Sequence, residues 1–168
     1  MSSEIDLAEA RARAIDPDVD LRIRAQRREL VGSHGLVLVV IALGGGLGAL
    51  ARYGLTELLP AAPGRLPWGT FTTNVSGCFL IGVLMVLISE IWSAHRLVRP
   101  FLGVGFLGGY TTFSTYAVEV RALLTPDSVA LAFAYLAGTL ICAMLAVVAG
   151  VCLTRAITGA AHGKESKV

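Results

Sequence analysis

The stretch "GGYTTFSTY", residues 108–116, places two glycines and four serine or threonine residues inside an otherwise apolar segment. Glycine and β-branched threonine are both unfavourable in a continuous helix. At membrane depth, a broken helix is tolerated only where its freed backbone groups are buried in protein or line a cavity. The stretch therefore predicts a membrane helix that breaks near its centre, with a polar site at the break.

The chain around this stretch is typical of a helical membrane protein. Its 168 residues are 55% hydrophobic and 15% charged, with a mean hydropathy of +0.71. A spanning helix needs about 20 mostly apolar residues. Four segments meet this need, at about 36–58, 68–90, 98–122 and 128–154. We expect an all-α membrane protein with a charged N-terminal tail at 1–34, a four-helix domain at 35–157 and a short tail at 158–168.

Basic residues predict the orientation of the chain, because cytoplasmic loops carry an excess of lysine and arginine. Both tails and the second loop lie on one side of a four-span chain and hold eleven basic residues, whereas the opposite side holds two. The eleven are Arg11, Arg13, Arg22, Arg24, Arg27, Arg28, Arg96, Arg99, Arg155, Lys164 and Lys167, and the two are Arg65 and Arg121. We expect both termini in the cytoplasm. A net charge of +2 does not favour nucleic-acid binding.

The motifs that could indicate an enzyme are incomplete or lie in the wrong structural context. "GVGFLG", residues 103–108, matches a dinucleotide pattern that is meaningful only between a strand and a helix. No Ser–His–Asp or Cys–His set occurs at a shared depth, and Cys78, Cys142 and Cys152 form no metal-ligand pattern. Glycines at 44, 48, 105 and 109 give two G-x-x-x-G patterns, which are typical of closely packed membrane helices.

Polar residues in the second and third segments have two interpretations each. Thr70, Thr73, Asn74 and Gly77 recur on one helical face. That face is either a hydrogen-bonded seam between helices or the wall of a polar path, in which Asn74 donates an N–H. Likewise Phe113 and Tyr116 either pack or present their positive ring edges to an anion. Carbonyls freed at the break can bind a hard cation.

Arg52, near the end of the first segment, has three possible roles: it snorkels to the membrane surface, caps helix carbonyls or attracts anions.

Three ordered motifs resemble those of the Fluc/CrcB family of fluoride channels. "GGGLGALARY" is similar to the first-span motif of the family, "GTFTTNVSGCFLIG" to its second and "GFLGGYTTFSTY" to its third. The resemblance extends from about Leu43 to Ile157. It implies a fluoride-selective channel that passively exports fluoride from the cytoplasm and protects the cell from fluoride toxicity.

The resemblance also implies an assembly and residue roles. Family members are antiparallel, dual-topology dimers whose third helix is broken. Asn74 and Phe113 match pore residues, and Ser114 and Thr115 match hydroxyls at the break. Tyr116 stands where a second phenylalanine is usual, which puts the permeation rate in question. The backbone carbonyls of Gly108 and Thr111, from both subunits, would hold a structural sodium ion that is not transported.

Two alternatives remain open from the sequence. A small dual-topology four-helix drug exporter would carry a carboxylate in the middle of its first span, and "VLVVIALGGGLGALA", residues 37–51, has none. A subunit that is active only with a homologous partner is the other alternative. The charge bias favours it, because a chain with one fixed orientation needs an oppositely inserted mate. We therefore expect either an antiparallel homodimer or a heterodimer with a homologous subunit in the cell membrane.

Overall fold

A computed structural model describes Arg24 and residues 35–62, 64–91 and 96–165 of the chain, and these residues are helical with short connections. From Val40 onward the described residues form one compact unit. In chain order the helices are α3 (Gly35–Leu58), α4 (Trp68–Val86), a π-helical turn (Leu87–Ile91), a π-helical segment (Arg99–Leu107), α5 (Gly108–Tyr110), α6 (Phe113–Leu123) and α7 (Val129–Glu165).

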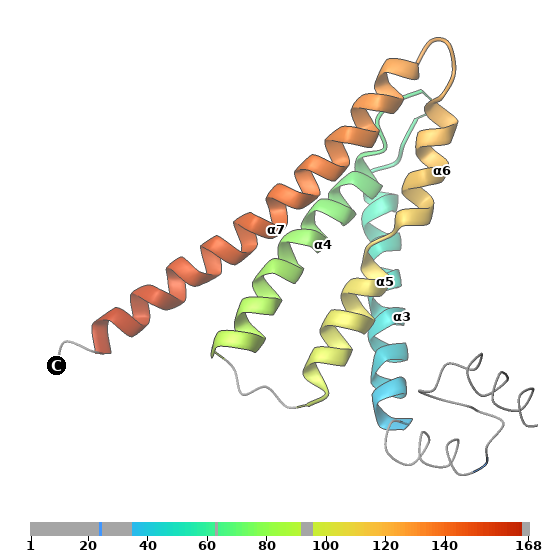
Figure 1. Cartoon of the computed structure of the whole chain (residues 1–168). Helices are drawn as coiled ribbons and strands as arrows, with labels where there is room; N and C mark the ends of the chain where they lie inside the picture. The colour runs from blue at the N-terminus through green and yellow to red at the C-terminus, as the bar shows by residue number, and fades with distance from the viewer. Residues whose placement is uncertain (1–23, 25–34, 63, 92–95, 166–168) are drawn as a thin grey trace, which may run out of the picture. The chain divides into compact units, whose positions relative to one another are not determined.

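Three of these helices are long and apolar enough to cross a membrane, within the part of the chain that the structure describes. They are Gly35–Leu58, Trp68–Glu90 and Val129–Gly159. The first two agree with the predicted segments. The third begins as predicted but extends to Gly159, beyond the predicted end at about 154, and α7 itself continues to Glu165. The predicted segment 98–122 is present as two helical pieces on either side of a break (Figure 1).

The predicted G-x-x-x-G packing is confirmed between α3 and the segment before the break. A Cβ atom added at Gly44 would lie 3.0 Å from the backbone nitrogen of Phe106, and one at Gly48 would overlap the Phe106 carbonyl oxygen. From the other side, a Cβ at Gly105 would lie 2.8 Å from the Ile41 carbonyl oxygen. Only glycine permits this backbone approach, and the approach holds the broken segment against α3.

A second glycine crossing joins α4 and α7, which lie side by side (Figure 1). An added Cβ at Gly82 would overlap the Val147 carbonyl, and one at Gly150 would overlap the Phe79 carbonyl. At one end of this pair Arg155 of α7 donates to Glu90, with 2.5 Å between Nη2 and Oε1. A buried cluster between α6 and α7 consists of Tyr116, Leu123, Ala132 and Tyr135.

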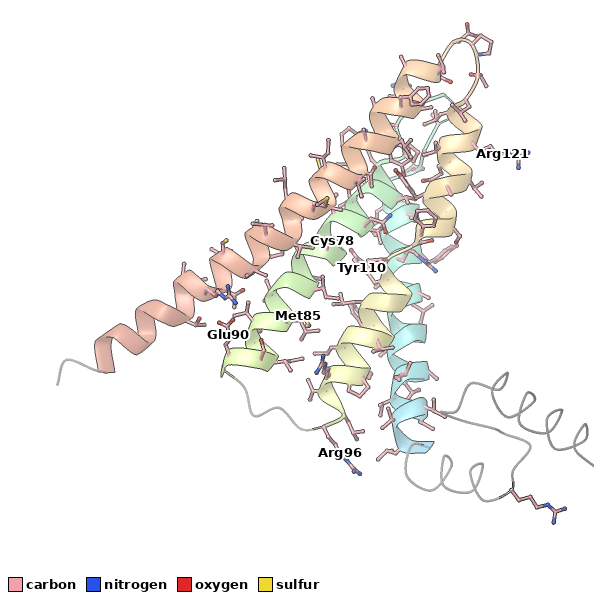
Figure 2. The ribbon with its side chains drawn as sticks, in the orientation of Figure 1. Cys78, Met85, Glu90, Arg96, Tyr110 and Arg121 are labelled. Atoms are coloured by element: carbon pink, nitrogen blue, oxygen red, sulfur yellow. The ribbon has the colours of Figure 1, made fainter. Side chains whose placement is uncertain are left out.

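The broken segment carries basic residues at both of its ends. Arg96 precedes it and Arg121 lies in its last turn, at opposite ends of the helices (Figure 2). This separation agrees with the assignment of these arginines to opposite sides. The predicted tail at 1–34 lies outside the described residues apart from Arg24.

Candidate functional site at the helix break

The break consists of two extended residues. Thr111 has φ −79° and ψ 156°, and Thr112 has φ −148° and ψ 124°. Thr112 is also the N-cap of α6, where its hydroxyl accepts a hydrogen bond from the Thr115 backbone nitrogen at 3.2 Å. Threonine is a favourable N-cap because its side chain satisfies a donor that the helix leaves free. A new helix, α6, therefore begins directly after the break, at Phe113.

Asn74 of α4 holds the break from the side. Its Nδ2 donates to the Thr112 carbonyl at 2.9 Å, and its Oδ1 accepts from the Thr112 backbone nitrogen at 2.8 Å. The Asn74 side chain thus replaces the helical partner of the Thr112 N–H and adds a donor to the Thr112 carbonyl. An asparagine amide has two N–H donors, so the second N–H remains for another acceptor.

The same contacts free two carbonyls. In a continuous helix Gly108 would accept from the Thr112 nitrogen and Thr111 from the Thr115 nitrogen. Those nitrogens instead donate to Asn74 and to the Thr112 hydroxyl. Arg52 of α3 donates to the Thr111 carbonyl at 3.3 Å. Of its three predicted roles, the contact matches the capping of a helix carbonyl.

A cavity of about 250 Å³ opens beside the break, between α4, α6 and α7. None of the side chains lining it is charged. They belong to Asn74, Cys78, Thr111, Thr112, Phe113, Tyr116, Thr139, Leu140 and Ala143. The N-terminus of α6 also borders the cavity and supplies a partial positive charge there. The cavity therefore offers an anion neutral donors and a helix terminus.

The two predicted aromatic residues behave differently. Phe113 is 79% exposed, whereas Tyr116 is 8% exposed and packs against Tyr135 with ring centroids 5.2 Å apart. The Tyr116 hydroxyl donates to the Leu136 carbonyl of α7 at 2.6 Å. The hydroxyl proton of Tyr116 is therefore engaged by a backbone carbonyl within the protein.

The other predicted polar residues separate into two groups. Ser114 and Thr115 lie at the break, and their hydroxyls lie 3.4 and 3.0 Å from the Thr112 hydroxyl, but they are exposed and do not line the cavity. Thr73 is fully buried and donates to the Gly69 carbonyl of its own helix. Of the four residues on the predicted polar face of α4, which are Thr70, Thr73, Asn74 and Gly77, only Asn74 lines the cavity. The buried Thr73 contributes to helix packing.

One further network was not predicted. Glu119 of α6 accepts hydrogen bonds from Thr70 at 2.7 Å and from Tyr135 at 2.8 Å, so its carboxylate joins α4, α6 and α7. Its position three residues after Tyr116 places it on the face of the aromatic pair. That spacing is the signal in the sequence from which a contact of Glu119 with this part of the site could have been predicted.

A comparison with protein families gives a match over residues 39–151 to the family model described as CrcB-like protein, Camphor Resistance (CrcB). The chain belongs to the CrcB family. A similar CrcB relative from Nocardia farcinica, named fluoride-specific ion channel FluC 2, is 57% identical over 126 residues, which are 75% of this chain and 90% of that protein.

Two further CrcB relatives come from Streptomyces. A protein of Streptomyces avermitilis named fluoride-specific ion channel FluC 2 is 50% identical, over 74% of this chain and 79% of its own length. A protein of Streptomyces coelicolor named fluoride-specific ion channel FluC 1 is 49% identical, over 76% of this chain and 82% of its own length. These CrcB relatives carry the names of channels, and the present chain, with its long apolar helices, is a multi-pass membrane protein.

Proposed function

We propose that this chain is a fluoride-specific ion channel that lets fluoride leave the cytoplasm passively and so protects the cell from fluoride. The CrcB relatives are named for this activity. The observation in the structure that carries the proposal is the free N–H of Asn74, which borders an uncharged cavity at the start of α6.

The composition of the cavity suits a strongly hydrated small anion. Selective passage requires groups that replace the water of the ion and yet release it. A lysine or arginine in the wall would bind fluoride tightly, whereas an amide and a helix N-terminus attract it weakly. No carboxylate lines the cavity to carry protons. A drug exporter, the alternative considered from the sequence, is therefore not favoured.

Growth of fluoride-sensitive cells tests this function. Cells that lack their own fluoride exporter should grow in millimolar-range fluoride when they produce this chain, alone or with a homologous subunit. The Asn74→Asp variant, produced at the same membrane level, is the matched control and should not rescue growth. Equal rescue by both proteins would contradict a fluoride path at Asn74.

The broken segment serves as the remaining membrane crossing. Residues Arg99–Leu123 span 25 positions, and at 1.5 Å per residue they extend about 37 Å, more than a hydrocarbon core of about 30 Å. With the three continuous helices this gives four crossings. An even number places both termini on the same side, and the excess of basic residues there favours the cytoplasm.

The exposure of Phe113 supports a dimer. An aromatic ring that is 79% exposed and borders the uncharged cavity at the break leaves that cavity without one wall. A second subunit, inserted in the opposite direction, would supply the wall. The two broken segments then meet near the centre of the membrane, because each break is near the middle of its crossing.

The mate is a homologous subunit of opposite orientation. Eleven basic residues against two fix this chain with its termini inside, so a second copy does not readily insert the other way. Streptomyces avermitilis has relatives named FluC 2 and FluC 3, which supports the existence of homologous partners. A homodimer is the alternative outcome.

A sodium ion at the dimer interface fits the freed carbonyls. Hard cations prefer oxygen ligands, and the Gly108 and Thr111 carbonyls have lost their helical partners. Arg52 already donates to Thr111, so the ion would share that oxygen with a guanidinium. Replacing sodium by potassium should lower the unfolding temperature of the assembled dimer. An unchanged temperature would contradict a structural sodium.

A further inference from the structure

Cys78 lies on α4 (Figure 2), and it lines two neighbouring cavities. The first is the cavity of about 250 Å³ beside the helix break. The second, of about 180 Å³, lies between α4 and the segment before the break, where Ile81 and Gly103 contribute to its wall. Cys78 and Thr111 line both cavities.

The two cavities lie at successive depths along α4. Asn74 lines only the first and Ile81 only the second, with Cys78 between them. At 1.5 Å per residue, the seven residues from Asn74 to Ile81 cover about 10 Å. That is roughly a third of a hydrocarbon core of about 30 Å. An ion that passes from one cavity to the other therefore travels a substantial part of the membrane and passes the Cys78 thiol.

A separate observation shows that the first cavity has a polar group in need of a partner. Thr139 of α7 lines it and is only 4% exposed, and its hydroxyl is the buried side-chain group left without a hydrogen-bond partner in the described part of the chain. A buried hydroxyl without a partner costs about 1–3 kcal/mol. The cost is removed when water or an anion in the cavity accepts the Thr139 proton. Cys78 thus borders a cavity in which the Thr139 hydroxyl can pair with water or an anion.

We propose that Cys78 lines the fluoride path at the junction of the two cavities, and that its thiol is a modification site at which conduction is blocked. The inference rests on the proposed function and adds a position to it. A thiol is a weak, neutral donor, so the unmodified side chain lets fluoride pass without trapping it. A group attached to the sulfur fills the junction.

The blocking reaction is a disulfide exchange with a methanethiosulfonate. The Cys78 thiol loses its proton to water, and the thiolate sulfur attacks the sulfenyl sulfur of the reagent. A new S–S bond forms, the bond between the sulfenyl and sulfonyl sulfurs breaks, and methanesulfinate leaves with its electron pair. A reducing dithiol reverses the modification. Propyl methanethiosulfonate is suitable because it is neutral and reaches thiols from either side of a vesicle.

The chain supplies its own controls. Cys142 and Cys152 lie on α7 and line neither cavity. The Cys142→Ser, Cys152→Ser double variant keeps Cys78 alone, and the Cys78→Ser variant keeps the other two. Both proteins are reconstituted in fluoride-loaded vesicles, with the homologous partner where conduction needs it. Fluoride release is measured before and after treatment, and intact mass gives the number of adducts on this chain.

We expect one adduct on the Cys78-only protein. Fluoride release should then be at least about tenfold slower, because ions cannot pass one another or the group that fills the junction. Dithiol treatment should restore release, and the Cys78→Ser protein should conduct equally before and after reagent. Normal release from a fully labelled Cys78-only protein would overturn this inference alone, as would a folded, conducting protein whose Cys78 does not react. Absence of release before treatment would contradict the proposed function, and this inference with it.

Discussion

Asn74 and Thr112 exchange two hydrogen bonds, 2.9 and 2.8 Å long, across the gap between α4 and the helix break. The pair satisfies the backbone of the extended residue, and Asn74, which also lines the cavity, keeps a second amide N–H. Structure and conduction therefore depend on one side chain, and substitutions at Asn74 test both.

Asn74→Asp should lower fluoride flux at least about a hundredfold, because a fixed negative charge repels the anion and the amide donor is lost. The carboxylate still accepts from the Thr112 nitrogen but no longer donates to the Thr112 carbonyl, so the flux is compared for assembled protein. Flux is measured with a fluoride electrode and assembly by size-exclusion chromatography. Normal flux through assembled Asn74→Asp protein would remove Asn74 from the path.

Tyr116→Phe should retain conduction, because the ring remains and only the hydrogen bond to the Leu136 carbonyl is lost. One lost hydrogen bond corresponds to about 1 kcal/mol of stability, which a modest decrease in unfolding temperature would show. The variant also leaves the Leu136 carbonyl with only its helical partner.

Phe113→Ile should lose most of the flux at nearly unchanged stability, because Phe113 is largely exposed within the single chain and its ring edge is the feature removed. Full activity in both the Phe113→Ile and Tyr116→Phe variants would mean that the aromatic pair serves packing alone.

Gly48→Ala should destabilise the protein by about 2 kcal/mol or more, since the new methyl group would overlap the Phe106 carbonyl and lie 2.8 Å from the Tyr110 nitrogen. Gly46→Ala, two residues earlier on α3, is the matched control, because an added Cβ there has no atom within 4 Å. Thermal unfolding in detergent compares them. Equal unfolding temperatures would show that the glycine contact does not hold the broken segment.

The orientation of the chain can be measured in cells with single cysteines in a cysteine-free background. One cysteine is placed in the tail at 1–34 and another in the 61–67 loop, and each is treated with an impermeant thiol reagent. The charge bias predicts that the loop reacts from outside and the tail does not. Labelling of half the tails from outside would favour a dual-topology homodimer instead.

Much of the fold follows from local patterns in the sequence. The apolar segments 36–58 and 68–90 agree with helices because length and hydropathy alone determine them. The break at Thr111 and Thr112 is predicted by the glycines and β-branched residues around it. The close approach at Gly44 and Gly48 is also predicted by its spacing. The last apolar segment extends to Gly159 and not to about 154, because the helix continues past the residues that a hydropathy pattern detects most strongly.

The site was less predictable because its contacts are tertiary. Asn74 stands out as an amide in an apolar helix, yet nothing local shows that it pairs with Thr112, 38 residues away. Glu119 lies near the end of the predicted segment 98–122, and only packing brings Thr70 and Tyr135 to it. Thr139 is a single hydroxyl in a long apolar run, and its missing partner is visible only when the cavity is known.

Fluoride release from liposomes tests the central claim most directly. Vesicles loaded with equal fluoride and chloride receive this chain, alone and together with a homologous subunit, and potassium permeability is supplied by an ionophore so that charge does not limit release. We predict rapid fluoride release that needs no proton gradient, with chloride retained. Fluoride release no faster than from protein-free vesicles in both preparations, or equal release of chloride, would contradict a fluoride-specific channel.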